Sequence, residues 1–189
     1  MSEQEHTFLF TDLVGFSTLT EIEGDHRGAE VAVSFFAAVR ALLPRHGAEE
    51  VKTLGDGLML RCDDPADAIA LGLRIVDDLG EAHGFPAVRV GMHTGPAVHR
   101  DGDWYGMTVN VAARLCAAAG GDEVLVSEAT RSAAGRMLKI GLGESRLHWL
   151  KNVTEPVSAS PARARLCPPG RRRGGARLAL PEVGSWRPA

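Results

Sequence analysis

The chain has 189 residues, of which 44% are hydrophobic and 24% charged, and its formal net charge is −3 at pH 7. This length accommodates one domain with a sizeable core, or one domain and a tail, and the composition is ordinary for a soluble globular protein. A slightly negative charge gives no general attraction to nucleic acids or anionic membranes. The chain has no apolar run of membrane-spanning length, its N-terminus MSEQEH lacks a signal-peptide pattern, and its three cysteines lack metal-ligand spacing. We therefore expect a cytoplasmic protein with no membrane partner.

The first half of the chain alternates short apolar runs with helical patterns. Five elements are expected there: a strand over residues 7–13, a helix that includes 30–43, a hairpin over 49–62, a helix over 65–83 and a strand over 87–92. The sequence TLTE at residues 18–21 matches a capping box, which predicts the start of the first helix. Asp64 followed by Pro65 predicts the start of the second helix.

The second half begins with a connection over residues 93–103 that is rich in Gly and Asp. After it we expect a helix over 106–118, a strand over 123–128, a short helix over 127–134 and a less regular stretch that ends near Val157. The order strand, helix, hairpin, helix, strand is that of the split βαβ arrangement. We therefore predict an α+β fold: a ferredoxin-like βαββαβ core with C-terminal α/β additions, in which helices pack on one face of an antiparallel sheet.

The composition changes at Ser158. Residues 158–189 are rich in Pro, Gly and Arg, and Glu182 is their only acidic residue. Such a composition is typical of a disordered segment. We expect a folded domain over residues 1–157 and a disordered tail over 158–189. The cationic cluster at 171–173 leaves a nucleic-acid-binding arm open as an alternative, against which the lack of interleaved aromatic residues argues.

Two aspartates lie where predicted core strands end. Asp12 closes the first strand, and Asp56 lies in the Gly55-Asp56-Gly57 turn of the hairpin. In a split βαβ sheet the first strand lies beside the hairpin, so the two carboxylates can converge at one edge. Close carboxylates repel each other unless a cation neutralises them, and hard oxygen ligands suit Mg²⁺ or Mn²⁺ that bridges substrate phosphates. Each aspartate also has a structural explanation, as a helix N-terminal anion or as a turn residue.

Three further residues fit phosphate chemistry. Gly15 precedes a predicted helix start, where free backbone N–H groups favour a phosphate next to Asp12. Asn110 and Arg114 are four residues apart on a predicted helix and therefore share a face. An arginine can stabilise the charge that develops during phosphoryl or nucleotidyl transfer. An ordinary helix asparagine and a surface arginine are the alternative reading.

Four segments carry a family resemblance: FTDLVGFS, VKTLGDGLM, VRVGMHTG and GDWYGMTVNVAARL. In this order and spacing they resemble the catalytic domain of class III adenylyl and guanylyl cyclases, from about Thr7 to about Val157. The family makes a cyclic nucleotide: the ribose 3′-oxygen of a nucleoside triphosphate attacks the α-phosphorus and pyrophosphate leaves. The resemblance implies a head-to-tail homodimer in which each active site combines residues of both protomers. The segment VSASPARARL departs from the family pattern, which has an aromatic-containing last strand there.

The resemblance implies a role for each candidate residue. Asp12 and Asp56 are expected to hold two Mg²⁺ or Mn²⁺ ions, with the Leu13 carbonyl as a further ligand. Asn110 is expected to orient the ribose, and Arg114 to steady the α-phosphate in the transition state. The remaining positions are expected to bind the triphosphate, and they are Gly15, Phe16, Ser17, Arg89 and Lys151.

Lys52 and Asp103 match the pair that reads the base in this family. Adenine presents an acceptor at N1 and a donor at its 6-amino group, whereas lysine is donor-only and an ionised aspartate is acceptor-only. Guanine reverses both edges, so the pair favours ATP over GTP. We therefore predict an adenylate cyclase that converts ATP to cyclic AMP and pyrophosphate. A catalytically weak or inactive nucleotide-binding scaffold and a guanylate cyclase remain as alternatives.

Overall fold

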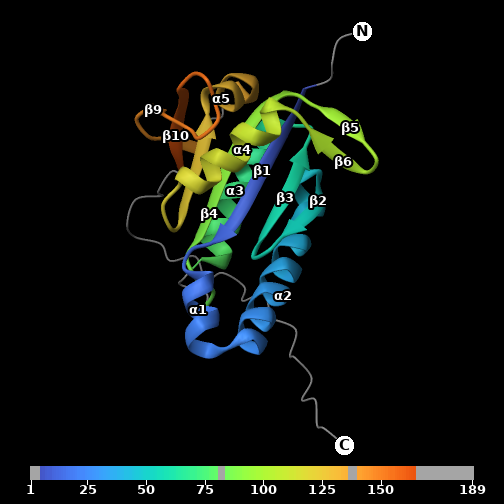
Figure 1. Cartoon of the computed structure of the whole chain (residues 1–189). Coiled ribbons are helices and arrows are strands. Elements are labelled where there is room, and N and C mark those ends of the chain that lie inside the picture. Colours follow the sequence, from blue (N-terminus) through green and yellow to red (C-terminus); the bar gives the residue numbers. More distant parts are fainter. Residues whose placement is uncertain (1–4, 81–83, 136–139, 165–189) are drawn as a thin grey trace, which may run out of the picture.

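The computed structural model describes residues 5–80, 84–135 and 140–164 (Figure 1). The elements of the first half are β1 (Glu5–Leu13), α1 (Phe16–Glu23), α2 (Asp25–Leu42), the 3-10 helix η1 (Leu43–His46), β2 (Ala48–Leu54), β3 (Gly57–Cys62) and α3 (Pro65–Leu79). Those of the second half are β4 (Val88–Pro96), β5 (Val98–Arg100), β6 (Asp103–Tyr105), α4 (Met107–Ala118), β7 (Glu123–Ser127), α5 (Glu128–Ala134), β8 (Ile140–Leu142), β9 (Arg146–His148) and β10 (Val157–Ala164). Among the helices in these ranges, none has the length and apolar character needed to cross a bilayer.

Within the described residues the strands form one eight-stranded sheet and one separate two-stranded sheet. The main sheet has the order β2-β3-β1-β4-β7-β10-β8, and β9 pairs with β10. β1 pairs antiparallel with β3 and β4, whereas β4 and β7 are parallel. In the described part of the chain β5 and β6 pair only with each other, and we call them the β5–β6 arm; Figure 1 shows it beside the main sheet. The predicted α+β class, with a mostly antiparallel sheet packed with helices, is confirmed.

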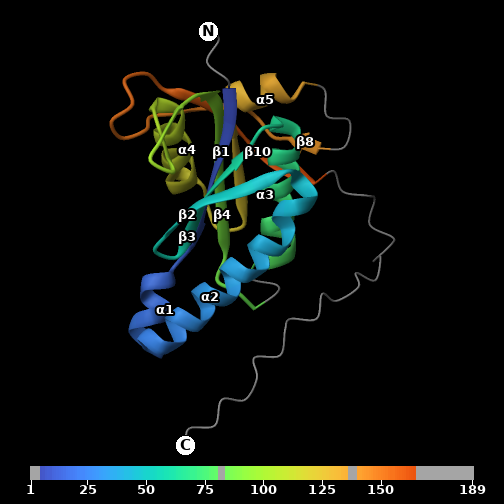
Figure 2. The same cartoon turned by 90° about the vertical axis from the view of Figure 1, so that its right-hand side faces the viewer.

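β1 is buried along almost its whole length because helices cover both faces of the sheet. Leu9 belongs to the core cluster that includes side chains of α2 and α3, while Phe8 and Phe10 belong to a cluster with α4. Successive side chains of a strand point to opposite faces, so both faces of β1 are apolar. Figure 2 shows α4 on one side of the sheet and α2 and α3 on the other. The prediction that the helices lie on one face is therefore wrong.

α4 lies directly on the backbone of β4. Gly91 of β4 makes this possible, since a Cβ atom there would lie 2.0 Å from the backbone nitrogen of Cys116. Interiors are close-packed, and backbone cannot yield to such an overlap without moving the whole helix. A glycine in the strand thus sets the height of α4, the helix that carries Asn110 and Arg114, above the sheet.

The two predicted helix starts have different outcomes. α1 begins at Phe16, directly after Gly15 with its positive φ of 78°, so the capping box predicted at 18–21 is wrong. The hydroxyl of Thr20 instead donates to the Phe16 carbonyl at 3.0 Å. At α3 the predicted N-cap is confirmed, because the Asp64 carboxylate accepts two backbone N–H groups of the first turn at 2.7 and 3.2 Å. That helix ends at Leu79, before the predicted end at 83.

The predicted domain boundary at residue 157 is also wrong. β10 (Val157–Ala164) pairs antiparallel with β7, β8 and β9. Its small residues Ala159, Ser160 and Ala162 are buried, so this strand is part of the packed domain. Pro161 has no N–H to donate, but its carbonyl accepts from the Gly143 amide at 2.7 Å. The folded domain thus reaches at least residue 164, and the rest of the predicted tail, including the cationic cluster at 171–173, lies outside the described residues.

Candidate active site

The end of β1 and the β2–β3 turn bring two carboxylates to one edge of the sheet. Asp12 is the penultimate residue of β1, and Asp56 lies in the turn between Leu54 and Gly57. A Cβ atom at Gly57 would lie only 2.0 Å from the Thr11 carbonyl oxygen. The turn can approach β1 this closely because Gly57 has no side chain. The structure therefore places Asp12 and Asp56 next to each other, as the topology predicts.

The neighbouring carboxylates affect each other's protonation. Burial and then the negative charge of Asp12 raise the pKa of Asp56 above its ordinary value. Hydrogen bonds from the backbone N–H groups of Asp56 and Leu13, and the charge of Arg89, oppose this increase only in part. A raised pKa means that the ionised form is destabilised, and a cation between the carboxylates would stabilise it.

Arg89 lies opposite Asp12 in the β1–β4 ladder and forms an ion pair with it. Its Nε and Nη2 atoms lie 2.7 and 2.5 Å from Asp12 Oδ2, and its Nη1 donates to the Ala117 carbonyl at the end of α4 at 3.2 Å. Both charged side chains are 28% exposed. The arginine expected to bind phosphate therefore supplies the countercharge of Asp12 in the free protein.

The start of α1 lies immediately after the edge of the sheet that carries Asp12 and Asp56, which we call the carboxylate edge. Gly15 has φ 78° and is the N-cap of α1, so the amides of Phe16 and Ser17 belong to its first turn. The amides of a first turn have no intrahelical acceptor, which leaves them available to a ligand. Val14 is fixed here by a hydrogen bond from its amide to the Ala87 carbonyl at 2.8 Å. Gly15 also borders a hollow of about 470 Å³ between α1, α2 and residues 84–87.

Lys52 and Asp103, which are 51 positions apart, form an ion pair between β2 and the β5–β6 arm. Lys52 Nζ donates to Asp103 Oδ2, and the Trp104 backbone N–H donates to Oδ1 at 2.8 Å. These two hydrogen bonds lower the pKa of Asp103, which is therefore an ionised acceptor at neutral pH. Lys52 remains 40% exposed and Asp103 23% exposed. The two residues predicted to read the base thus lie together where a ligand can reach them.

Asn110 and Arg114 occupy the exposed face of α4, one turn apart, as their spacing predicts. Within the described ranges neither side chain has a hydrogen bond or ion pair, with Asp12, Asp56 or any other residue. Lys151 is also exposed, in the segment that follows β9. The structure therefore does not unite these three residues with the carboxylates in one chain.

The carboxylate pair suits a metal ion that is shared with a substrate. Over residues 5–80, 84–135 and 140–164, no group of three or more His, Cys, Asp or Glu side chains could hold a metal ion. Asp12 and Asp56 offer carboxylate oxygens and Leu13 a backbone carbonyl, and all of these are hard donors. Such an incomplete oxygen set fits Mg²⁺ or Mn²⁺, which keep several ligand positions for water and phosphate oxygens. It does not fit a closed structural zinc site.

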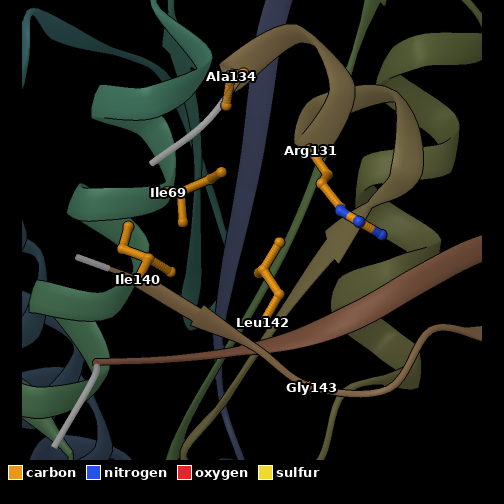
Figure 3. Close-up of a pocket in the computed structure, with 7 residues that line it drawn as sticks. Ile69, Arg131, Ala134, Ile140, Leu142 and Gly143 are labelled. Carbon is orange, nitrogen blue, oxygen red and sulfur yellow. The ribbon is translucent and has the colours of Figure 1, made fainter. Parts of the chain in front are cut away.

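A separate cavity of about 230 Å³ lies between α3, α5 and β8 (Figure 3). Ile69, Ile140 and Leu142 give it an apolar wall, and Arg131 lies at its side. None of the residues predicted to act on a nucleotide lines this cavity. Conversely, sequence reasoning missed Gly57, Gly91 and Trp104, which set the positions of the predicted residues. Their only sequence signal is that each lies inside or beside a motif segment.

The family model of the adenylate and guanylate cyclase catalytic domain matches residues 1–146 of the chain. A pH-sensitive adenylate cyclase of Mycobacterium tuberculosis is 37% identical over 129 residues, which are 68% of this chain and 32% of that protein. An adenylate cyclase of Streptomyces griseus is 38% identical over 120 residues, which are 64% of this chain and 30% of that protein. The chain therefore spans about a third of the length of these curated relatives.

Solved structures share the fold at lower identity. The adenylyl cyclase CyaB from P. aeruginosa has a TM-score of 0.73 at 21% identity and covers 89% of this chain and 95% of its own. The guanylate cyclase domain of RhGC from Catenaria anguillulae, in complex with GTP, has a TM-score of 0.73 at 18% identity and covers 87% and 98%. Both structures have the same TM-score, so the fold alone does not indicate which nucleotide the chain uses. The chain belongs to the family of adenylate and guanylate cyclase catalytic domains.

Proposed function

We propose that the protein is an adenylate cyclase, which converts ATP to 3′,5′-cyclic AMP and pyrophosphate. The observation that carries this proposal is the ion pair between Lys52 and Asp103. It presents a donor and an acceptor side by side, which is the complement of the N1 and 6-amino edge of adenine. Family membership and the adenylate cyclases at 37% and 38% identity support the same activity.

Residues at the carboxylate edge are proposed to hold the triphosphate and its metal ions. Asp12, Asp56 and the Leu13 carbonyl would hold two Mg²⁺ or Mn²⁺ ions, which when bound activate the ribose 3′-hydroxyl and neutralise the phosphates. The first-turn amides of α1, which begins after Gly15, would donate to phosphate oxygens. Arg89 would exchange its Asp12 partner for a phosphate oxygen, because a cation then balances that carboxylate.

Residues of α4 are proposed to act on the reacting atoms. Asn110 would hold the ribose so that its 3′-oxygen faces the α-phosphorus in line with the leaving pyrophosphate. Arg114 would donate to the α-phosphate oxygens, on which negative charge increases as the new P–O bond forms and the bond to pyrophosphate breaks. Lys151 would contribute a point charge to the triphosphate.

A second copy of the chain is proposed to complete each site. Asn110 and Arg114 are exposed, and in the described part of the chain no hydrogen bond or ion pair links them to the carboxylates. A head-to-tail homodimer would set α4 and the Lys52–Asp103 pair of one protomer against Asp12 and Asp56 of its partner. Two equivalent sites then form, because each protomer carries both sets of residues.

The activity is tested by supplying the purified protein with Mn²⁺ and either ATP or GTP and separating the products. We expect cyclic AMP and pyrophosphate from ATP, and a loss of at least about 100-fold in Asp56→Ala. Glu144→Ala removes an exposed carboxylate away from the site and should retain activity. Binding of ATP without turnover would instead identify a scaffold, and cyclic GMP as the main product would identify a guanylate cyclase.

The shared site is tested by mixing two inactive variants, Asp12→Ala and Arg114→Ala. Random pairing in an equal mixture gives one intact site in each heterodimer, so roughly a quarter of the wild-type activity should return. Heterodimer formation is measured separately by affinity tags of two kinds. Heterodimers that form and remain inactive would contradict the shared site.

A further inference from the structure

The β5–β6 arm carries Asp103 but lies outside the main sheet. Its two strands pair only through three residue pairs: Val98 with Tyr105, His99 with Trp104 and Arg100 with Asp103. An isolated two-stranded ribbon is at best marginally stable in water. The position of Asp103 must therefore depend on side chains that tie the arm to the body of the domain.

Trp104 provides the main aromatic contact between the arm and the body. The centroid of its indole ring lies 4.6 Å from that of His6 and 5.6 Å from that of Phe8, both on β1. The guanidinium carbon of Arg61, on β3, lies 5.3 Å from the indole centroid, within cation–π range. From the arm itself, His99 packs on the ring at 4.9 Å. Such contacts fix both the position and the tilt of an aromatic ring.

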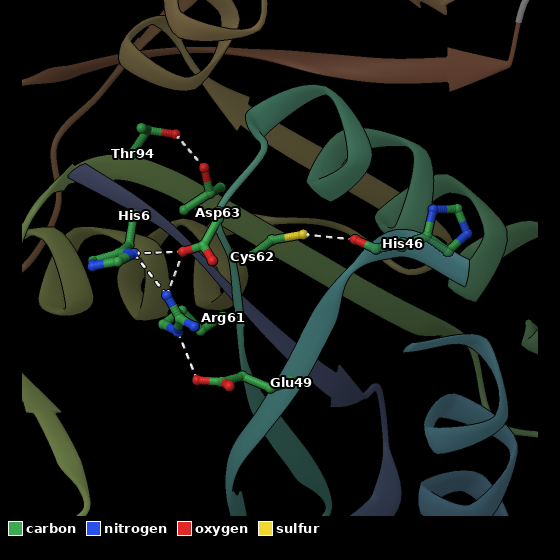
Figure 4. A network of polar contacts seen from close by, with 8 residues as sticks. His6, His46, Glu49, Arg61, Cys62, Asp63 and Thr94 are labelled. Atoms are coloured by element: carbon green, nitrogen blue, oxygen red, sulfur yellow. Dashed lines mark hydrogen bonds and ion pairs between the residues drawn. The ribbon is translucent and has the colours of Figure 1, made fainter. Parts of the chain in front are cut away.

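The residues around the indole are themselves held in a polar network, shown in Figure 4. Nδ1 of His6 lies 2.8 Å from Asp63 Oδ1 and 2.8 Å from Arg61 Nη1. Arg61 also forms an ion pair with Asp63, and its Nε donates to Glu49 Oε1 at 2.6 Å. His6 is 6% exposed, and the Arg61 side chain is 16% exposed. The indole therefore rests on a part of β1, β2 and β3 whose side chains are fixed by several partners.

The backbone of Trp104 transmits this fixed position to the base-reading pair. Its N–H donates to Asp103 Oδ1 at 2.8 Å, which turns Oδ2 toward Lys52. The next residue, Tyr105, is 53% exposed, so its ring is not seated against the body of the domain as the indole is. Its side chain adds a smaller hydrogen-bond contribution to the lowered pKa of Asp103. The orientation of the Asp103 carboxylate thus follows from where the indole is seated.

We propose that Trp104 is a positioning residue for base recognition: its indole, seated against His6, Phe8 and Arg61, fixes the Asp103 carboxylate against Lys52. The link to adenine rests on the proposed function, whereas the positioning is a property of the free protein. Trp104 acts through Asp103, so its loss should weaken the choice of base more than the chemical step.

The positioning is tested without a nucleotide by titrating the side-chain carboxyl ¹³C resonance of Asp103. The Lys52 and Trp104 hydrogen bonds lower the pKa of Asp103 in the wild type. Trp104→Leu should raise that pKa toward the ordinary aspartate value, and Trp104→Phe should largely preserve it. Trp149→Leu removes a tryptophan that is 78% exposed and should leave it unchanged. Arg61→Met, which removes the cation on the indole, should raise it less than Trp104→Leu.

The link to base choice is tested by measuring kcat and KM for ATP and GTP. Trp104→Leu should lower kcat/KM for ATP at least about tenfold, mainly by raising KM. It should also reduce the preference for ATP over GTP. In an Asp103→Asn background, Trp104→Leu should cause almost no further loss of kcat/KM for ATP, since the two residues act together.

Two results would overturn the inference: an unchanged Asp103 pKa in folded Trp104→Leu, or an equal loss of ATP preference with and without the Asp103 carboxylate. If Trp104→Leu does not fold, an Asp103 pKa in Arg61→Met equal to the wild-type value contradicts the inference in its place. A wild type that makes no cyclic nucleotide contradicts the proposed function, and the titration then still decides the positioning.

Discussion

Asp12 and Asp56 are positioned by backbone pairing, whereas Asp103 is positioned by side chains. β1 is paired on both sides, and Gly57 lets the hairpin turn touch its backbone. Among the described strands the β5–β6 arm has no partner in the main sheet, and it is held by Trp104 and by the ion pair to Lys52. Central strands open only with global unfolding, while a ribbon can shift locally. The positions of Asp12 and Asp56 should thus depend on backbone geometry, and the proposed base reading by Lys52 and Asp103 on single side chains.

The largest effect is expected from Gly57→Ala, which would break the carboxylate edge. The new Cβ atom would lie 2.0 Å from the Thr11 carbonyl oxygen, so the turn and β1 must separate. We expect the free energy of unfolding to fall by about 3 kcal/mol or more, together with loss of cyclase activity. Urea denaturation measures the first and product formation the second.

Gly55→Ala is the matched control in the same turn. A Cβ atom at Gly55 meets nothing within 4 Å, but φ there is 63°. The expected cost is therefore only that of a left-handed backbone, about 1–2 kcal/mol. Equal losses in the two variants would show that the close approach at Gly57 is not what holds the turn.

Lys52→Glu should abolish the proposed base reading and leave Asp12 and Asp56 in place. It places two negative side chains opposite each other where adenine needs one donor and one acceptor. We expect the ratio of kcat/KM for ATP to that for GTP to fall at least about 100-fold. Calorimetric titration should show unchanged Mn²⁺ affinity.

Arg40→Glu is the control for Lys52→Glu, because it also removes an ion pair that involves β2. Arg40 of α2 pairs with Glu50 of β2 at 2.6 and 2.8 Å, away from Asp103. That variant should keep the ATP preference. A preserved preference in Lys52→Glu would contradict the assignment of the pair.

Asp56→Asn should separate the contribution of this carboxylate to activity from its effect on stability. Burial and the Asp12 charge raise the pKa of Asp56, so its ionisation destabilises the folded state as pH rises above the ordinary aspartate value. Without divalent metal, the variant should melt a few degrees above the wild type at pH 7. The difference should vanish below about pH 4, where both states are protonated.

Asp12→Asn is the control for this measurement, because it should change the melting temperature in the opposite direction. It weakens the ion pair with Arg89 and should therefore lower the melting temperature at pH 7. Mn²⁺ should stabilise the wild type and neither variant. An Asp56→Asn protein that melts below the wild type at pH 7 without metal would contradict the predicted repulsion.

The smallest effect is expected at His93 of β4, away from both parts of the site. Burial lowers the pKa of His93, whose Nδ1 lies 2.8 Å from Ser127 Oγ. The unfolded chain therefore binds more protons than the folded one just below pH 6.5, and acidification destabilises the protein. In His93→Gln, the loss of unfolding free energy between pH 7 and 5 should be smaller by about 1 kcal/mol or less. An unchanged loss would show that His93 does not contribute.

Features with strong local signals could be predicted from the sequence. The run over residues 7–13 is apolar because helices cover both faces of β1, and Asp64 before Pro65 marks a helix start that the structure confirms. The approach of Asp12 and Asp56 follows from topology alone, since the hairpin must lie beside the first strand. The capping box predicted at 18–21 is wrong because the helix already begins at Phe16, directly after Gly15 with its positive φ.

Features that depend on distant contacts could not be predicted. The three-residue strands of the β5–β6 arm lie in a stretch read as a connection, and their anchor is the contact of Trp104 with His6, almost 100 positions earlier. β10 contains Pro161 and resembles a tail by composition, yet pairing with β7 makes it a strand. The ion pair of Arg89 with Asp12 depends on a strand register that no local pattern encodes.

Competition between ATP and GTP tests directly whether the protein is an adenylate cyclase. The wild-type protein receives equal concentrations of ATP and GTP with Mn²⁺, and the cyclic products are separated by chromatography. The Lys52–Asp103 pair predicts cyclic AMP in large excess over cyclic GMP. Cyclic GMP in equal or greater amount, or no cyclic product at all, would contradict an adenylate cyclase.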